Sequence, residues 1–273
     1  MPRPAKHAYF DVPLPMILGH RGAAGSAPEN TLASFARGLA DGAQVLETDV
    51  HATRDGVPVL LHDERVDRTT DGSGAIAALD FAALQRLDAG YRFSPGDGGD
   101  FPFRGRGLRV PSLQEAFAAF PDARFNLEIK SGGRALLRRV VGLVTELRRE
   151  DRTLLVAGDD ALQAELRAVL AETGARPALG ASVADVLDVV GSAVAGRAPN
   201  TDSMALQIPR EFAGRPLVTR ELVEHCHRHG LAVHVWTIDE PDEMRELLAL
   251  GVDGLVTDYP GRLAALLGRA ARD

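Results

Sequence analysis

Short apolar runs alternate with longer amphipathic segments along most of this chain. The runs typical of strands are Met16–Leu18, Val45–Val50, Val57–Leu61, Phe125–Ile129, Thr153–Ala157, Pro177–Ala181, Met204–Ile208, Ala232–Ile238 and Gly254–Thr257. The segments with helical spacing are Thr31–Ala40, Ala135–Arg149, Asp160–Ala171, Ser182–Val190, Arg220–His229 and Glu240–Leu250. This alternation predicts a parallel sheet with helices outside it.

The second and third runs lie too close together to be parallel neighbours. A parallel crossover needs a dozen or more residues, and the interval from Val50 to Val57 has no room for one. Arg54-Asp55-Gly56 is a turn sequence, so Val57–Leu61 must return antiparallel as a hairpin arm. Eight runs then remain, which predicts a (β/α)8 TIM barrel with a β-hairpin excursion after the second strand.

Residues 64–110 interrupt the alternation. This segment is rich in Gly, Asp and Pro, and it has a short helical piece, Phe81–Asp88, but no clear strand. Long loops in compact domains commonly act as lids or binding loops. We therefore expect a single catalytic barrel domain over residues 1–273, with 64–110 as an insertion over the barrel mouth. For the Gly-rich tip, a plain surface loop is the alternative.

An internal echo supports the barrel and sets one residue apart. The segment ADGAQVLETD (Ala40–Asp49) resembles ALGVDGLVTD (Ala249–Asp258), and both pass from a helix end through Gly into a strand that ends in Thr-Asp. The second copy has Val256 where the first has Glu47. Because the scaffold does not require a carboxylate there, a chemical role for Glu47 is favoured.

Carboxylates mark the ends of two predicted strands. Glu47 and Asp49 are two residues apart and face the same side of one strand; Glu128 and Lys130 form a similar pair on another. At the carboxyl ends of barrel strands these groups face the active-site mouth. Three converging carboxylates stay ionised only beside a cation, and oxygen ligands suit Mg2+ or Ca2+ better than zinc. Surface salt bridges with arginines are the alternative.

Two histidines and an arginine accompany the acids. His20 and Arg21 follow the first strand, and the hairpin brings His62 back to the level of Glu47. The arginine fork suits a phosphate because it donates two parallel hydrogen bonds, and the following glycines allow close backbone approach. His20 and His62 can then flank a phosphate as base and acid.

Charge and composition limit the partners. The formal charge of -7 opposes nucleic acid and acidic membrane surfaces. No apolar run is long enough to span a membrane, so no transmembrane segment is expected. The N-terminal stretch lacks the apolar core of a secretory signal, and the single cysteine, Cys226, excludes an internal disulfide. A cytoplasmic protein with a small-molecule partner is the expectation.

The candidate site residues described above occur in segments that resemble the glycerophosphodiester phosphodiesterases. The longest is GHRGAAGSAPENTLASFARGLADGAQVLETDVHATRDGVPVLLHDERVDRTTDGSG, residues 19–74. The others are LDAG (87–90), VPSLQEAF (110–117), NLEIK (126–130), HVWT (234–237) and GVDGLVTDYP (251–260). The resemblance covers nearly the whole chain in order and is most specific through residue 130.

The resemblance implies a TIM barrel that hydrolyses glycerophosphodiesters to an alcohol and glycerol 3-phosphate with one divalent cation. It gives His20 and His62 the acid and base roles, and it gives phosphate binding to Arg21 and Lys130. Trp236 would line the glycerol side, and the metal ligands would be Glu47, Asp49 and Glu128. Two departures affect the pocket: Asp239 stands where the family often has Asn, and Ala157-Gly158 where it often has Ser-Phe.

Several alternatives stay open at this level. Water can attack phosphorus directly, or a glycerol hydroxyl can attack first to give a cyclic phosphate; we favour His20 as base and His62 as acid in either route. A phosphodiesterase of lysophospholipase D type, acting on lipids, is the first rival, and Tyr91, Phe93, Phe101 and Phe103 could contact an acyl chain or pack the insertion. A non-catalytic barrel that binds glycerophosphodiesters is the second.

Four further features have structural interpretations. His225, His227 and His229 are expected at a helix end rather than around a metal, because Gly230 is a helix stop. His51 is expected to be solvated and His234 to lie in the core or behind the site. Asn30 is expected to cap the first helix, with the site also within its reach.

Overall fold

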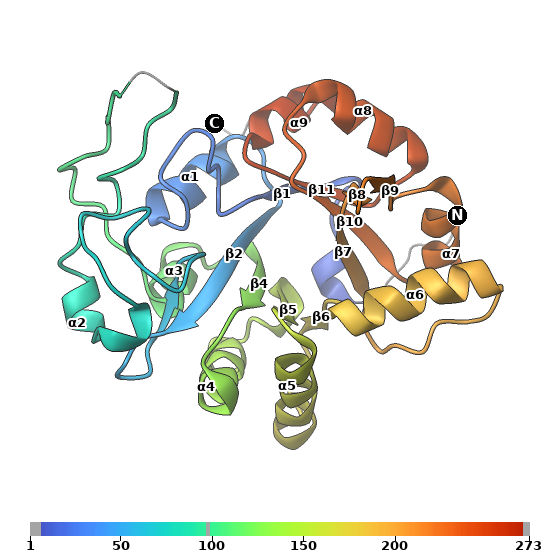
Figure 1. Ribbon diagram of the computed structural model, residues 1–273, viewed down its shortest axis with the longest axis horizontal. Helices are drawn as coiled ribbons and strands as arrows, with labels where there is room; N and C mark the ends of the chain where they lie inside the picture. Colours follow the sequence, from blue (N-terminus) through green and yellow to red (C-terminus); the bar gives the residue numbers. More distant parts are fainter. Residues whose placement is uncertain (1–6, 97–98, 270–273) are drawn as a thin grey trace.

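A computed structural model describes residues 7–96 and 99–269. In this part of the chain, eight parallel strands pair in the order β6-β5-β4-β2-β1-β11-β10-β7 (Figure 1). Their bounds are β1 Met16–Gly19, β2 Val45–Ala52, β4 Arg124–Ile129, β5 Thr153–Ala157, β6 Ala178–Leu179, β7 Ala205–Pro209, β10 Ala232–Trp236 and β11 Gly254–Thr257. A parallel bridge between Gly180 and Ala205 links the two end strands, so the barrel is nearly closed. The predicted (β/α)8 fold is confirmed.

The third apolar run returns antiparallel, as its short spacing requires. It forms β3 (Pro58–Leu60), which pairs with the end of β2, Val50 lying opposite Leu60. The turn between the strands contains Gly56 with a φ of 80°, a conformation that favours glycine. This hairpin carries the chain back toward the barrel and places residues 61–63 beside the end of β2.

Helices cover the outside of the barrel. They are α1 Leu32–Ala40, α3 Leu113–Ala119, α4 Gly133–Glu146, α5 Asp160–Thr173, α6 Val183–Ala195, α7 Arg220–Arg228, α8 Pro241–Leu250 and α9 Pro260–Leu266. Their apolar faces pack on the outward residues of the strands; the rings of Phe35 and Phe117 meet Phe125 of β4 edge-on, with centroids 5.9 and 5.2 Å apart. Each such buried side chain contributes roughly 1.5–3 kcal/mol.

A separate set of apolar residues fills the barrel near the amino ends of its strands. Tyr9 and Phe10, from a 3-10 helix at Ala8–Phe10, pack against inward residues such as Met16 and Val45. This cluster closes one end of the barrel, and the polar residues described below therefore gather at the other end.

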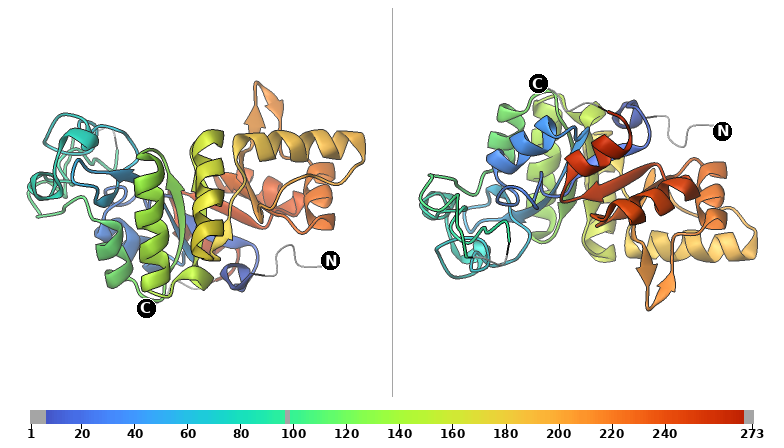
Figure 2. Two further views of the ribbon diagram at one scale, coloured as in Figure 1. Left: turned by 90° about the horizontal axis from the view of Figure 1, so that it is seen from below. Right: turned by 90° about the horizontal axis from the view of Figure 1, so that it is seen from above.

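The insertion has its own small core and lies beside α1 and β2 (Figures 1 and 2). Val66, Ile76 and Leu84 pack with Val59 of β3. It contains a 3-10 helix at Ile76–Ala78 and the short α2, Phe81–Leu84. Tyr91 and Phe101 each stack with Arg104, while Phe93 meets Phe103 edge-on, so these aromatic residues pack the insertion together.

Two helices and a small hairpin have no counterpart in the sequence prediction. They are α3, α9 and a small hairpin of β8 (Glu211–Phe212) and β9 (Arg215–Pro216), which projects beyond β7 (Figure 2). A further 3-10 helix spans Glu150–Arg152. None of the helices in the described ranges could span a lipid bilayer.

Candidate active site

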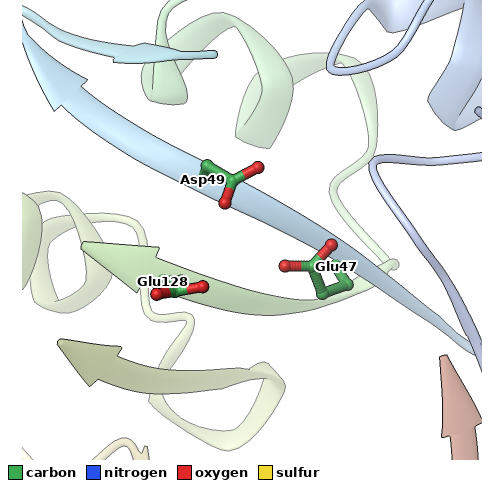
Figure 3. Close-up of side chains that lie close together, drawn as sticks. All are labelled: Glu47, Asp49 and Glu128. Atoms are coloured by element: carbon green, nitrogen blue, oxygen red, sulfur yellow. The ribbon is translucent and has the colours of Figure 1, made fainter. Parts of the chain in front are cut away.

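Three carboxylates meet where β2 and β4 run side by side. Glu47 and Asp49 point to the same side of β2, and Asp49 lies in register with Glu128 of β4 (Figure 3). Each residue offers an oxygen within 4.8 Å of the other two. Glu47 and Asp49 are buried, 8% and 2% exposed, so the cluster lies inside the barrel end rather than on the surface.

Basic groups only partly balance this negative charge. The Lys130 ammonium lies 2.7 Å from Glu128 Oε2 and 3.1 Å from Asp49 Oδ1, and Arg21 Nε lies 3.4 Å from Asp49. Glu47 accepts a hydrogen bond from the backbone N–H of Arg21. Burial, with the charge of Asp49, nevertheless raises the pKa of Glu47 to about 7.

The donor set fits a hard divalent cation. Its ligand atoms are carboxylate oxygens alone, which Mg2+ and Ca2+ prefer. The raised pKa of Glu47, caused first by burial and then by the charge of Asp49, favours an added positive charge beside these carboxylates. Within residues 7–96 and 99–269, Glu47, Asp49 and Glu128, all predicted from the sequence, form the group able to hold such an ion.

The loop between β1 and α1 places Arg21. Gly22 has a φ of 96°, and a Cβ on it would lie 2.5 Å from the backbone carbon of Ser34. The Ser34 hydroxyl donates to Arg21 O and accepts from Ala23 N. The close approach that this glycine allows is therefore to helix α1, and it turns Arg21 toward Asp49.

Asn30 has one of its two predicted roles: it reaches the site, but it does not cap the helix. The helix cap is Thr31, whose hydroxyl accepts from Ser34 N, so the assignment of the cap to Asn30 is wrong. The Asn30 amide instead donates to Asp49 Oδ2 at 3.2 Å and accepts from the Thr48 hydroxyl. A left-handed backbone, φ 57°, directs this buried side chain into the site.

His20 is held by an aspartate that the sequence analysis missed. Its Nδ1 lies 2.7 Å from Oδ1 of Asp258, the residue after β11. Burial alone would lower the pKa of His20, but the Asp258 hydrogen bond and the Glu47 charge outweigh it and raise that pKa. Asp239, which stands where the family often has Asn, accepts a hydrogen bond from the Asp258 N–H. It therefore helps to hold Asp258 in place beside His20.

His62 has a similar partner. Its Nδ1 lies 2.7 Å from Oδ1 of Asp63, the next residue. The His62 carbonyl lies 3.0 Å from Nε2 of His51, whose other ring nitrogen contacts Ser131. His51 is 2% exposed, so the expectation that it is solvated is wrong: it is buried because the hairpin and the end of β4 fold over it.

Trp236 is the last residue of β10. It is 45% exposed and lines a cavity of about 380 Å³. The other residues around that cavity are Pro209, Arg210, Glu211, Thr237, Ile238 and Glu243, none of them predicted site residues. Gly158, the second departure, lies near the carboxylates instead: a Cβ there would sit 3.5 Å from Glu128 Oε1.

Two of the remaining histidines have polar partners away from the site. Nε2 of His225 contacts the Ser192 hydroxyl, and Nε2 of His227 contacts Asp253. Helix α7 ends at Arg228 before Gly230, as expected. His234 is fully buried inside the barrel, and burial lowers its pKa to about 4.

Comparison with known proteins connects this site to a family. The model of the glycerophosphoryl diester phosphodiesterase family matches residues 20–262. A glycerophosphodiester phosphodiesterase from Caldanaerobacter subterraneus subsp. tengcongensis is 30% identical, the match covering 92% of this chain and 97% of the relative. A human protein named lysophospholipase D is 27% identical, over 92% of this chain and 85% of the relative.

A solved structure has the same architecture. The phosphodiesterase of Oleispira antarctica, in complex with the product sn-glycerol-3-phosphate, superposes with a TM-score of 0.74 at 25% identity. The match covers 93% of this chain and 97% of that one.

Proposed function

The chain belongs to the glycerophosphoryl diester phosphodiesterase family, and from that premise we propose that it hydrolyses glycerophosphodiesters to an alcohol and glycerol 3-phosphate. The observation that carries the proposal is the convergence of three carboxylates, Arg21 and His20 at the barrel end where His62 returns. The substrate is a small molecule with an anionic phosphodiester, which this mixture of charges can bind and activate.

We assign the cation site to Glu47, Asp49 and Glu128, with Mg2+ or Ca2+ as the ion. When bound, the cation supplies positive charge that stabilises the anionic phosphate in the transition state. Arg21 donates to the phosphate through its fork, and Lys130 adds a point charge beside it. Asn30 holds Asp49 in place through its amide.

The two histidines move the protons. Each has Nδ1 against an aspartate, so each imidazole is oriented and its Nε2 is directed to the substrate. We propose that His20 removes a proton from the attacking hydroxyl, whether this is water or a glycerol hydroxyl. His62 then protonates the leaving alkoxide, so the P–O bond that breaks yields a neutral alcohol.

A lipid substrate is the second candidate. The human relative named lysophospholipase D favours it, and so do two exposed aromatic residues, Phe212 (70% exposed) on β8 and Trp236. The aromatic residues of the insertion do not add to this surface, because they stack with one another and with Arg104. A barrel that only binds its ligand is opposed by the sequence, which has both histidines and all three carboxylates of the family motifs.

The test is release of glycerol 3-phosphate from glycerophosphocholine in Mg2+, in Ca2+ and in excess chelator. We expect release that depends on the cation. Release from lysophosphatidylcholine but not from glycerophosphocholine would favour the second candidate. An absence of release from both substrates with every cation would overturn the proposal.

A further inference from the structure

A continuous chain of ion pairs joins the two ends of the proposed site. Arg21 Nη1 lies 2.8 Å from Glu29 Oε1. Arg68 donates two hydrogen bonds to the same carboxylate, from Nη1 at 2.6 Å and from Nη2 at 2.7 Å. Arg68 also contacts Asp63 at 2.7 and 3.1 Å, and Asp63 contacts His62. The phosphate-binding arginine and the proposed acid are therefore connected through charged groups alone.

Arg68 is the central member of this chain. Its guanidinium makes two contacts to each of two carboxylates, a geometry that its rigid planar fork suits and an ammonium cannot copy. Arg68 lies in the insertion, 39 residues from Glu29 in the β1–α1 loop and five residues from Asp63 in the turn after β3. The fold brings them together only at the barrel mouth.

The charges of Glu29 and Asp63 explain why a positively charged residue is needed at position 68. The Glu29 side chain is only 17% exposed, and burial would raise its pKa, but hydrogen bonds from Arg68 and Arg21 lower it. The Arg68 hydrogen bond, the largest influence, likewise lowers the pKa of Asp63 to about 2. Both carboxylates thus stay ionised, and without Arg68 they would repel an anionic substrate and leave Arg21 drawn toward Glu29.

We propose that Arg68 is a positioning residue that fixes Arg21 through Glu29 and His62 through Asp63, and that neutralises both carboxylates beside the phosphate site. The inference rests on the proposed function, because it assigns Arg21 to the phosphate and His62 to the leaving group. It gives the insertion a direct part in the reaction: the insertion supplies the group that orients the site.

The series of ion pairs has two arms, from Arg68 through Glu29 to Arg21 and from Arg68 through Asp63 to His62. Steady-state kinetics can separate their effects. Glu29→Gln should raise KM and weaken glycerol 3-phosphate binding more than it lowers kcat, because Glu29 contacts Arg21 directly and reaches His62 only through Arg68 and Asp63. Asp63→Asn should lower kcat more than it raises KM, because Asp63 contacts His62 directly and reaches Arg21 only through Arg68 and Glu29. Arg68→Gln should do both, by roughly 10- to 100-fold each, since misplacement by about 1 Å has effects of that size. Arg68→Lys should have a KM between those of the wild type and Arg68→Gln.

Arg54→Gln is the matched control. Arg54 also makes a two-point contact to a carboxylate, Asp80, but this exposed pair is not connected to either histidine. Melting temperatures of all variants identify unfolding, and if Arg68→Gln does not fold, the other three variants carry the test. A general loss of stability would not divide between KM and kcat along the two arms.

The inference is overturned if the wild type is active and Arg68→Gln, Glu29→Gln and Asp63→Asn keep both constants within about twofold of the Arg54→Gln values. If the wild type releases no glycerol 3-phosphate, the proposed function fails instead. Calorimetric binding of inorganic phosphate then still tests the Arg21 arm, because binding needs no turnover: weaker binding by Arg68→Gln supports the inference, and equal binding overturns it.

Discussion

Nδ1 of His20 lies 2.7 Å from Oδ1 of Asp258, joining the ends of the neighbouring strands β1 and β11. Asp258 raises the pKa of His20 against the effect of burial. If His20 is the base, activity rises with pH as His20 loses its proton.

Asp258→Asn should therefore move the acid limb of the kcat/KM profile to lower pH and reduce kcat, by roughly 10- to 100-fold, because the imidazole is no longer oriented. The pH–rate profile checks this. Asp253→Asn is the control, since Asp253 makes a comparable 2.8 Å contact to His227 away from the site. An unshifted acid limb in Asp258→Asn would remove Asp258 from the mechanism.

His62→Ala should lower kcat by several powers of ten, within the roughly 10²- to 10⁴-fold range of acid–base catalysis. Binding of Mg2+ or Ca2+, measured by calorimetry, should hardly change, because His62 is not among the three carboxylate ligands proposed. His229→Ala, at the exposed end of α7, is the control. Near-normal turnover in His62→Ala would exclude His62 as the acid.

Glu128→Gln should weaken binding of Mg2+ and Ca2+. Loss of a group that merely orients a metal ligand costs roughly 10- to 100-fold in affinity, so loss of a ligand should cost at least as much. Glu172→Gln is the matched control, because Glu172 is an exposed glutamate paired with Arg138 on the outside of the barrel. Equal cation affinities for the two variants would place the ion elsewhere.

Gly22→Ala should destabilise the fold far more than Gly56→Ala. Both glycines have positive φ, which an alanine tolerates at a cost of roughly 1 kcal/mol. A Cβ at Gly22 also meets the backbone of Ser34 at 2.5 Å, whereas a Cβ at Gly56 meets nothing within 4 Å. We expect roughly 3 kcal/mol or more for Gly22→Ala by urea unfolding; equal losses would show that the loop can shift freely.

His234 should make the protein less stable in acid. The unfolded histidine takes up a proton as the pH falls below about 6.5, while burial holds the pKa of the folded one at about 4. The unfolded state binds more protons in this window, so stability falls from pH 6.5 to 4 by on the order of 3 kcal/mol. Urea unfolding of His234→Leu should lack this part of the slope; an unchanged slope would contradict the argument.

Much of the architecture could be predicted because it depends on local spacing. Six residues, 51–56, separate Val50 at the end of one run from Val57 at the start of the next, and only a hairpin fits that distance. Helix α3 was missed although Ser112 and Glu115 form a capping box, because seven residues are too few to show a period. The β8–β9 hairpin was missed because its strands have two residues each.

The sequence by itself determined the barrel and the three carboxylates, since alternation along a strand and register at its carboxyl end follow from backbone geometry. Only the tertiary structure decided which groups hold the side chains proposed to be catalytic. Asp258 is 238 residues from His20, and Arg68 meets Glu29 across 39 residues. Such partners are selected by the three-dimensional path of loops and by the need to pair buried charge, and neither leaves a periodic trace in the chain.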